Sequence, residues 1–373
     1  MKIGFTCYPT HGGSGVIATE LGKLLAERGH DIHFITYDMP FRLGGFQQNI
    51  FYHEVEVSRY SLFKYPPYDL TLASRMAQVA KLYELDLLHV HYAVPHAISA
   101  YLAKQMVGEH LKVVTTLHGT DITVLGDDPT LHNIICFGMK QSDAVTAVSE
   151  NLKQQTQELF NPDLEIDRIY NFVDQRIYHP RNVRYLKDNY VCPDEKLIIH
   201  ISNFREVKRP HDVIKVFDQI QKALPARLLL VGQGPEWSAI HELVRSLNLT
   251  DRVHFLGRQD DVSQFMSIAD LLLLPSAKES FGLVALEAMA CGVPTIGSRI
   301  GGIPEVVIHG ETGYLAELGD VNEMAKYAIN ILQNDSTHQL FVQNGLHRVD
   351  QEFRADRIVD QYEALYERVL GEK

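Results

Sequence analysis

Short apolar runs alternate with segments of helical periodicity along the first half of the chain. Strands are predicted at Lys2–Tyr8, Asp31–Tyr37, Phe51–Val57, Leu87–Tyr92, Lys112–His118 and Ala144–Ser149. Helices are predicted between them at Gly15–Arg28, Thr71–Glu84 and His96–Gly108. Strands that alternate with helices in this way are typical of βαβ units, in which a parallel sheet is covered by helices on both faces.

The same alternation starts again after a polar stretch that ends at Asp194. New strands are predicted at Lys196–Ser202, Arg227–Val231, Arg252–Leu256, Leu271–Leu274 and Pro294–Ser298. We therefore expect an α/β protein with two Rossmann-like, doubly wound domains that face each other across a cleft. The boundary is expected near residue 170, which gives domains at 1–170 and 171–354. The last helix, about 355–373, carries apolar residues at helical spacing and is expected to pack back onto the first domain.

The composition is that of a soluble globular protein, with 45% hydrophobic and 22% charged residues among 373. No apolar run approaches the roughly 20 residues that span a bilayer. The formal net charge of −12, without a basic run, argues against nucleic acid and anionic membranes as partners. The four cysteines form no C-x-x-C pair, which fits reduced thiols in the cytoplasm.

Eighteen histidines raise the question of a metal site, but none of them has the spacing of known zinc ligands. His89 and His91 fall on one face of a predicted strand, and we interpret them as core or cleft residues. The sequence predicts neither a metal nor a cofactor.

The most informative segment runs from Glu279 to Glu287, after the apolar strand Leu271–Leu274. It is interpreted as a loop that leads into a helix, with Ser280 as the N-cap and Gly292 as the stop. That helix is apolar almost all round, and an unpaired glutamate is rarely left in such a helix. A helix start at the carboxyl end of a parallel strand favours anions, and a carboxylate there can accept both hydroxyls of a ribose. The segment predicts a nucleotide-sugar site.

Glycines follow the first predicted strand, where they would let backbone N–H groups approach a phosphate. The run Gly13-x-Gly15-x-x-Ala18 also satisfies the dinucleotide fingerprint, with Asp38 as the acid for a ribose. An NAD-dependent dehydrogenase is therefore the alternative enzyme class, and an ordinary tight turn explains the glycines as well. The residues Pro9-Thr-His11 before the glycines suit an open loop better than the compact nicotinamide turn.

A cluster of cations lies at the end of the second domain's first strand, where Arg205, Lys208 and Arg209 fall within five residues. Such cations can neutralise a diphosphate, with charge-assisted bonds of about 1.5–3 kcal/mol each. An exposed basic turn is the alternative. Gly234 ends the next strand and Arg258 follows the one after, where a nucleobase could be read, although turn residues explain both equally well.

Polar side chains also close two strands of the first domain. Tyr92 ends one of them, and the segment Thr115–Asp121, which contains His118, ends the next. Side chains at these positions would face the cleft and could touch a sugar or an acceptor, whereas satisfied polar residues at strand ends are the simpler explanation. The loops at Gly297–Glu305 and Gly310–Gly313 are interpreted as structural, the second as a hairpin-like turn.

Taken together, these motifs resemble the retaining GT-B glycosyltransferases of family 4 over nearly the whole chain, and the E-x7-E motif of Glu279 and Glu287 is the most specific of them. More narrowly, Cys7–Val16, Phe63–Tyr68 and Ser202–Arg209 are similar to members that transfer N-acetylglucosamine from UDP-N-acetylglucosamine to L-malate in bacillithiol biosynthesis. The resemblance implies a metal-independent hexosaminyltransferase with these two small-molecule substrates. A homodimer is compatible with the sequence, which does not determine the oligomeric state.

The resemblance also implies roles for individual positions. The catalytic set is His118, Glu279, Arg205 and Lys208. The donor-binding set is Gly13, Ser14, Asn203, Gly234, Arg258, Phe281, Gly282, Leu283 and Glu287. Glu287 would hold the ribose hydroxyls, and His118 would lie near the C6 hydroxyl of the sugar. In the family an arginine usually stands five residues before the lysine, whereas Arg205 precedes Lys208 by three, so either Arg205 or Asn203 fills that place.

A dicarboxylate acceptor needs cations, and the first domain offers Arg59 and Lys64 close together. The acceptor-binding candidates are Ser14, Lys64, Tyr92, Thr116 and Thr120. Since no protein nucleophile is evident, retention suggests that the acceptor hydroxyl attacks on the face of the leaving group. A family 4 enzyme with another donor or acceptor, and a nucleotide-sugar-binding regulator without activity, are the remaining alternatives.

Overall fold

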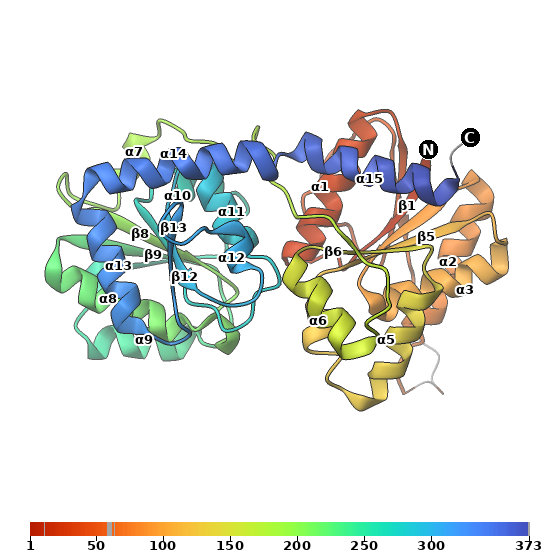
Figure 1. Cartoon of the computed structure of the whole chain (residues 1–373), viewed down its shortest axis with the longest axis horizontal. Coiled ribbons are helices and arrows are strands. Elements are labelled where there is room, and N and C mark those ends of the chain that lie inside the picture. The colour runs from red at the N-terminus through yellow and green to blue at the C-terminus, as the bar shows by residue number, and fades with distance from the viewer. Residues whose placement is uncertain (11, 58–61, 63, 372–373) are drawn as a thin grey trace. The chain divides into compact units, whose positions relative to one another are not determined.

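The computed structural model describes residues 1–10, 12–57, 62 and 64–371. The chain forms two compact units, shown in Figure 1. Unit 1 comprises Met1–Asn171 together with Ala355–Lys373, and unit 2 comprises Phe172–Arg354. The chain therefore leaves unit 1 after its sheet is complete, builds unit 2, and returns to unit 1 with its last helix. Among the described residues, no helix is both long enough and apolar enough to cross a membrane.

Unit 1 is built on a parallel sheet of seven strands in the order β3-β2-β1-β4-β5-β6-β7. The strands are β1 (Lys2–Thr6), β2 (Asp31–Thr36), β3 (Ile50–Glu54), β4 (Leu87–His91), β5 (Lys112–Leu117), β6 (Ala144–Ala147) and β7 (Asp167–Arg168). The connecting helices are α1 (Gly13–Glu27), α2 (Tyr68–Tyr83), α3 (Ile98–Val107), α4 (Thr120–Thr123), α5 (Pro129–Gln141) and α6 (Glu150–Phe160), with the short segment η1 (Ala93–Ala97) before α3. All residues of β4 are buried, as a central parallel strand requires.

The last helix, α15 (Ala355–Leu370), is part of unit 1 and runs beside α1 (Figure 1). Its buried face carries Tyr362 and Tyr366, whose side chains reach the sheet. The hydroxyl of Tyr366 is 2.7 Å from Nδ1 of His89 on β4. On the outer side, Arg28 at the end of α1 pairs with Asp360, with Nη1 and Oδ1 2.6 Å apart. Apolar burial and polar contacts thus both attach this helix to unit 1.

Unit 2 has a six-stranded parallel sheet in the order β10-β9-β8-β11-β12-β13. Its strands are β8 (Lys196–Ile201), β9 (Ala226–Val231), β10 (Val253–Gly257), β11 (Leu271–Leu274), β12 (Thr295–Ser298) and β13 (Gly313–Ala316). The helices are α7 (Arg184–Lys187), α8 (Pro210–Ala223), α9 (Trp237–Ser246), α10 (Ser263–Ile268), α11 (Leu283–Ala290), α12 (Ile303–Val306), α13 (Val321–Gln333) and α14 (Asp335–Glu352), with short 3₁₀ turns η2 (Glu206–Lys208) and η3 (Thr250–Arg252). The four leucines of β11 are buried on both faces of the sheet.

Two parallel sheets with connecting helices confirm the predicted α/β class. Two local predictions were wrong. The helix after β11 begins at Leu283, with Gly282 as its N-cap at a φ of 94°, so Ser280 is not the cap. Gly310–Gly313 does form a turn, closed by the N–H of Gly310 on the carbonyl of Gly313, but it leads into the parallel strand β13 instead of a hairpin.

Candidate active site

Three loops of unit 2 lie at the carboxyl edge of its sheet, after β8, β9 and β11. Lys208 from the first loop reaches Glu279 from the third, with 2.5 Å between Nζ and Oε1. The hydroxyl of Ser276 donates to the same carboxylate oxygen at 3.1 Å. The side chains of Lys208 and Glu279 are 23% and 15% exposed. The structure thus brings two predicted site residues into a largely buried ion pair at the start of α11.

Two glycines, Gly301 and Gly302, hold the loop before α11. The N–H of Gly302 donates to the carbonyl of Glu279 at 3.0 Å. A Cβ at Gly301 would lie 1.9 Å from that carbonyl oxygen, so only glycine permits the approach. The helix then starts at Leu283, where first-turn N–H groups lack partners within the helix and the helix dipole favours an anion. Phe281 is buried against Phe353, which fixes the backbone that precedes this helix start.

Glu287 lies in the middle of α11 and is only 7% exposed. Its neighbours Leu286 and Ala288 are fully buried, and the helix is apolar around it, as the sequence predicts. Burial raises the pKa of Cys291, one turn further along, to about 12, and the charge of Glu287 adds to this rise. A carboxylate in such surroundings is costly unless polar groups meet it.

The loops after β8 and β9 touch each other through their backbones. A Cβ at Gly234 would lie 1.8 Å from the carbonyl oxygen of Asn203, so glycine is needed for this contact. The N–H of Glu236 donates to the carbonyl of Phe204 at 3.0 Å and reinforces it. The side chains of Asn203, Arg205 and Arg258 are exposed, so each is accessible to a charged ligand.

In unit 1, predicted site residues gather around Tyr92, which directly follows β4. Its hydroxyl is 3.1 Å from Oγ of Ser14, in the first turn of α1, and also bonds to Thr120. Its ring centroid is 5.6 Å from that of His118. Gly13 is the first residue of α1. The loops after β1, β4 and β5 therefore present two hydroxyls, a phenol and an imidazole in one place.

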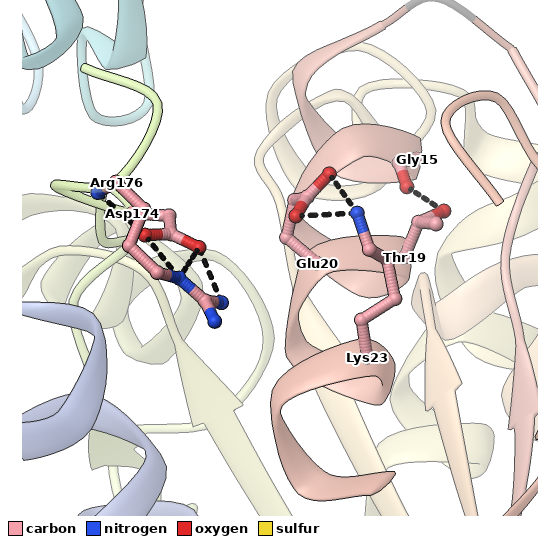
Figure 2. A network of polar contacts seen from close by, with 6 residues as sticks. All are labelled: Gly15, Thr19, Glu20, Lys23, Asp174 and Arg176. Carbon is pink, nitrogen blue, oxygen red and sulfur yellow. Dashed lines mark hydrogen bonds and ion pairs between the residues drawn. The ribbon is translucent and has the colours of Figure 1, made fainter. Parts of the chain in front are cut away.

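After the glycine loop, α1 carries two polar contacts between Gly15 and Lys23 (Figure 2). The hydroxyl of Thr19 donates to the carbonyl of Gly15 at 2.8 Å, and Lys23 pairs with the buried Glu20 at 3.1 Å. A Cβ at Gly15 would lie 2.5 Å from the carbonyl oxygen of Tyr8. This close backbone contact explains why position 15 is a glycine. The glycine is therefore no evidence for a bound dinucleotide.

His118 is held by a second imidazole. Its Nε2 is 2.8 Å from Nδ1 of His91, and the two rings stack with centroids 5.1 Å apart. Burial lowers the pKa of His118 to about 3 and that of the nearby His96 to about 4. For the same reason, the pKa of His91 lies well below its usual value. These imidazoles are therefore neutral near pH 7, and they act as hydrogen-bonding groups without charge.

The structure removes one acceptor candidate. Thr116 is fully buried, with its hydroxyl 2.7 Å from both Nε2 of His89 and Oγ1 of Thr146. Its hydroxyl is therefore part of the core beneath the site, and this prediction was wrong. Lys64 is exposed, with its Nζ 5.4 Å from the ring centre of Tyr65. The predictions that involve His11, Arg59 and Phe63 fall outside the described residues.

Asp121 belongs to the segment Thr115–Asp121 that closes β5, but its residue type alone indicates no role there. Asp121 is fully buried at the start of α4 and accepts the N–H groups of Ala93 and Gly119 at 3.0 and 2.9 Å. The missed signal is an aspartate three residues after a strand-end histidine.

In unit 2, Asp174 binds Nε and Nη2 of Arg176 at 2.9 and 2.6 Å (Figure 2), a pair that no sequence motif indicates. Within the described residues, no group of three or more His, Cys, Asp or Glu side chains is placed to hold a metal.

Comparisons with known proteins agree with this arrangement. A family model described as Glycosyltransferase Family 4 matches residues 11–176, and one described as Glycosyl transferases group 1 matches residues 186–348. N-acetyl-alpha-D-glucosaminyl L-malate synthase of Bacillus anthracis is 57% identical over 371 residues, which cover 99% of this chain and 97% of the relative. An uncharacterized glycosyltransferase of Methanocaldococcus jannaschii is 26% identical and covers 91% of this chain and 90% of its own length.

Two solved structures share the fold. Sucrose-phosphate synthase from Thermosynechococcus elongatus aligns with a TM-score of 0.84 at 23% identity and covers 99% of both chains. HepE from Anabaena, solved with UDP and glucose, aligns with a TM-score of 0.81 at 23% identity and covers 98% of this chain and 99% of its own.

Proposed function

The chain belongs to the family 4 and group 1 glycosyltransferases, and from this premise we infer that it forms N-acetyl-alpha-D-glucosaminyl L-malate. The donor is UDP-N-acetylglucosamine, the acceptor is the hydroxyl of L-malate, and the product enters bacillithiol biosynthesis. The observation that carries this inference is the 57% identity to a synthase of that product over 99% of the chain.

We propose that unit 2 binds the donor. The buried Glu287 receives the ribose hydroxyls, and the N–H groups of Phe281, Gly282 and Leu283 receive the sugar and phosphate together with Glu279. This proposal is supported by the position of α11, because a helix start at the carboxyl edge of a parallel sheet is a suitable place for a phosphate.

Lys208 and Arg205 supply positive charge for the departing diphosphate. Lys208 is paired with Glu279, with 2.5 Å between Nζ and Oε1. A bound diphosphate competes for this ammonium and releases the carboxylate toward the sugar hydroxyls. Charge of this kind, aimed at the leaving group, contributes most where negative charge develops in the transition state.

The acceptor binds to unit 1 in this proposal. Ser14, Tyr92 and Thr120 form a connected group of hydroxyls that suits a carboxylate and a hydroxyl of malate. Lys64, which is exposed, supplies a cation. His118 donates or accepts a hydrogen bond as a neutral imidazole beside the transferred sugar.

The reaction is proposed to retain the anomeric configuration. The malate hydroxyl attacks C1 on the face from which UDP leaves, so that one C–O bond forms as the other breaks. The malate hydroxyl proton passes to the departing phosphate oxygen, and Lys208 stabilises the charge that remains. We further propose a cytoplasmic location, which fits four free cysteines at Cys7, Cys136, Cys192 and Cys291.

The test is an incubation of the purified chain with UDP-N-acetylglucosamine, with and without L-malate, in EDTA. Release of UDP that depends on malate, with a product of the mass of glycosylated malate and an α-anomeric proton signal, is the expected result. UDP release that is independent of malate would contradict the acceptor, and a β-linked product would contradict retention.

A further inference from the structure

One buried carboxylate connects the two loops that carry Tyr92 and His118. Oδ2 of Asp121 accepts the N–H of Ala93 at 3.0 Å, in the loop after β4. Oδ1 accepts the N–H of Gly119 at 2.9 Å and that of His118 at 3.3 Å, in the loop after β5. Each oxygen therefore serves one loop, and the side chain is fully buried between them.

Both loops contain a residue with a positive φ, and the one at Tyr92 needs support from its surroundings. Tyr92 has a φ of 93°, in the left-handed region that a residue with a Cβ rarely adopts. Gly119 has a φ of 109°. The N–H of Tyr92 donates to the carbonyl of Thr116 at 3.0 Å, so the two strand ends are also joined directly. Asp121 accepts the N–H of Ala93, which follows Tyr92, and the N–H groups of His118 and Gly119. These bonds fix the backbone from which the phenol and the imidazole project.

We propose that Asp121 is a positioning residue for the transfer reaction, which holds the Tyr92 and His118 loops in the relative arrangement that the acceptor and the sugar require. This inference rests on the proposed function. Asp121 does not touch a substrate in this role, and its effect reaches the reaction through the two backbones that it binds. A displacement of about 1 Å at the reacting groups can reduce the rate by about 100-fold.

The role depends on the charge of Asp121, because a protonated carboxyl has one oxygen that donates instead of accepting. Burial raises the pKa of Asp121 to about 6, against the lowering effect of its backbone N–H bonds. Among the titratable groups around it, the pKa values of His96 and His118 are lowered by burial to about 4 and 3, and that of His91 is also far below its usual value.

The phenols nearby do not titrate in this range either. Burial raises the pKa of Tyr8 to about 12, and it also raises that of Tyr92. Between pH 5 and 7 Asp121 therefore changes its charge, whereas these imidazoles and phenols do not. As the pH falls through about 6, Asp121 takes up a proton, one loop loses its acceptor, and turnover declines.

The experiment compares Asp121→Asn with the wild type and with Asp128→Asn. Asp128 is an exposed N-cap of α5 that accepts the N–H of Thr130 at 2.8 Å, so its substitution removes a backbone-binding carboxylate away from the Tyr92 and His118 loops. We expect Asp121→Asn to lower kcat by about 100-fold and to raise the KM for malate. UDP affinity, measured by calorimetry, should stay unchanged, because the contacts proposed for Glu287 and the start of α11 lie in unit 2. Asp128→Asn should behave like the wild type in each measurement.

A pH series from 5 to 8 provides the second measurement. In the wild type, kcat/KM for malate should fall about tenfold per pH unit below pH 6, whereas Asp121→Asn, already neutral, should lack this decline. Asp121→Ser, which is smaller and also neutral, should reproduce the Asn result. Unchanged turnover in the Asn variant, or an acid decline that persists in it, would overturn the inference.

Three outcomes separate the inference from its alternatives. Loss of UDP binding along with turnover in both Asp121 variants would show that Asp121 supports the fold as a whole, which contradicts a positioning role. Absence of turnover in the wild type would refute the proposed function and this inference with it. Normal turnover by both the wild type and Asp121→Asn would refute the inference alone.

Discussion

In the proposed reaction, Lys208 exchanges its partner Glu279 for the diphosphate of the donor. In the structure it lies 2.5 Å from Glu279, and both side chains are mostly buried. We expect Lys208→Met to lower kcat by about 100- to 1000-fold, the usual loss when one group that stabilises a developing anion is removed. Steady-state kinetics with both substrates would measure this. Lys215→Met, an exposed lysine on α8, is the matched control, and a Lys208 variant with the control's kcat would refute the role.

Glu287 is the residue whose burial was predicted from its neighbours alone, and it is 7% exposed. Loss of two charge-assisted bonds to ribose should cost about 2–4 kcal/mol, or about 30- to 1000-fold in kcat/KM for the donor. Glu287→Ala is the variant, and Glu242→Ala, exposed on α9, is its control. A folded Glu287→Ala enzyme with near-normal donor kcat/KM would exclude the ribose contact.

At the scale of elements, the loops at the sheet edge of unit 2 depend on close backbone contact. A Cβ at Gly234 would lie 1.8 Å from the carbonyl oxygen of Asn203. Because this is too close, either the loop after β8 or the loop after β9 would have to move. We expect Gly234→Ala to weaken UDP binding by about tenfold or more, since a shift of this size disturbs aligned donor contacts. Gly44→Ala, where nothing lies within 4 Å of the added Cβ, should bind UDP normally in the same titration. Equal affinities in the two variants would exclude this coupling.

The returning helix α15 supports the floor of the unit 1 site. The hydroxyl of Tyr366 is 2.7 Å from Nδ1 of the buried His89, whereas that of Tyr362 is 3.5 Å from Thr116, which has shorter bonds elsewhere. Tyr366→Phe leaves a buried nitrogen unpaired and should reduce the free energy of unfolding by about 1–3 kcal/mol. Tyr362→Phe should cost less, because its partner stays satisfied. Urea denaturation followed by circular dichroism measures both, and a larger loss for Tyr362→Phe would contradict the explanation.

Element positions were largely predictable because the apolar runs mark buried parallel strands. Leu271–Leu274 is β11 as predicted, while other strands, such as Phe51–Val57, end earlier than expected, at Glu54 in that case. The start of α11 was misplaced because Ser280 has the residue type of an N-cap, whereas the left-handed φ of Gly282 decides the helix start. Such a conformation depends on contacts with Gly301 and Gly302, which are distant in sequence.

At the site, the sequence identifies residue types at strand ends but not the direction of their side chains. Tyr92 and His118 come together as their strand-end positions suggest, and Ser14 joins them from the first turn of α1. Thr116 was misjudged because alternation along β5 directs its hydroxyl to His89 and α15, and that register becomes visible only once the last helix is placed. Asp121 was passed over for a related reason, since its partners are backbone N–H groups that no motif specifies.

Across the whole molecule, buried histidines couple stability to pH. Burial lowers the pKa of His89 and His118 to about 3 and that of His96 and His200 to about 4. The unfolded value is about 6.5. Below that pH the unfolded chain binds more protons, so the stability that these groups contribute is complete above pH 6.5 and is lost as the pH falls toward 4 and 3. Asp121, with a raised pKa of about 6, acts in the opposite direction, as does Asp69, whose pKa burial also raises, but the buried histidines outnumber these two carboxylates.

We expect the urea midpoint of unfolding to decline steadily from pH 7 to pH 5. Each such histidine should lower the free energy of unfolding by about 1.4 kcal/mol per pH unit below 6.5. His200 offers a direct test in unit 2, because its nitrogens bond the carbonyl of Leu273 at 2.9 Å and the hydroxyl of Ser202 at 2.8 Å. A glutamine can make similar bonds without titrating. His200→Gln should therefore make the free energy of unfolding depend less steeply on pH, by about 1.4 kcal/mol per pH unit. His110→Gln, at an exposed position, should leave it unchanged. A wild-type midpoint that is flat over this range would mean that the buried imidazoles take up protons without unfolding, which their burial argues against.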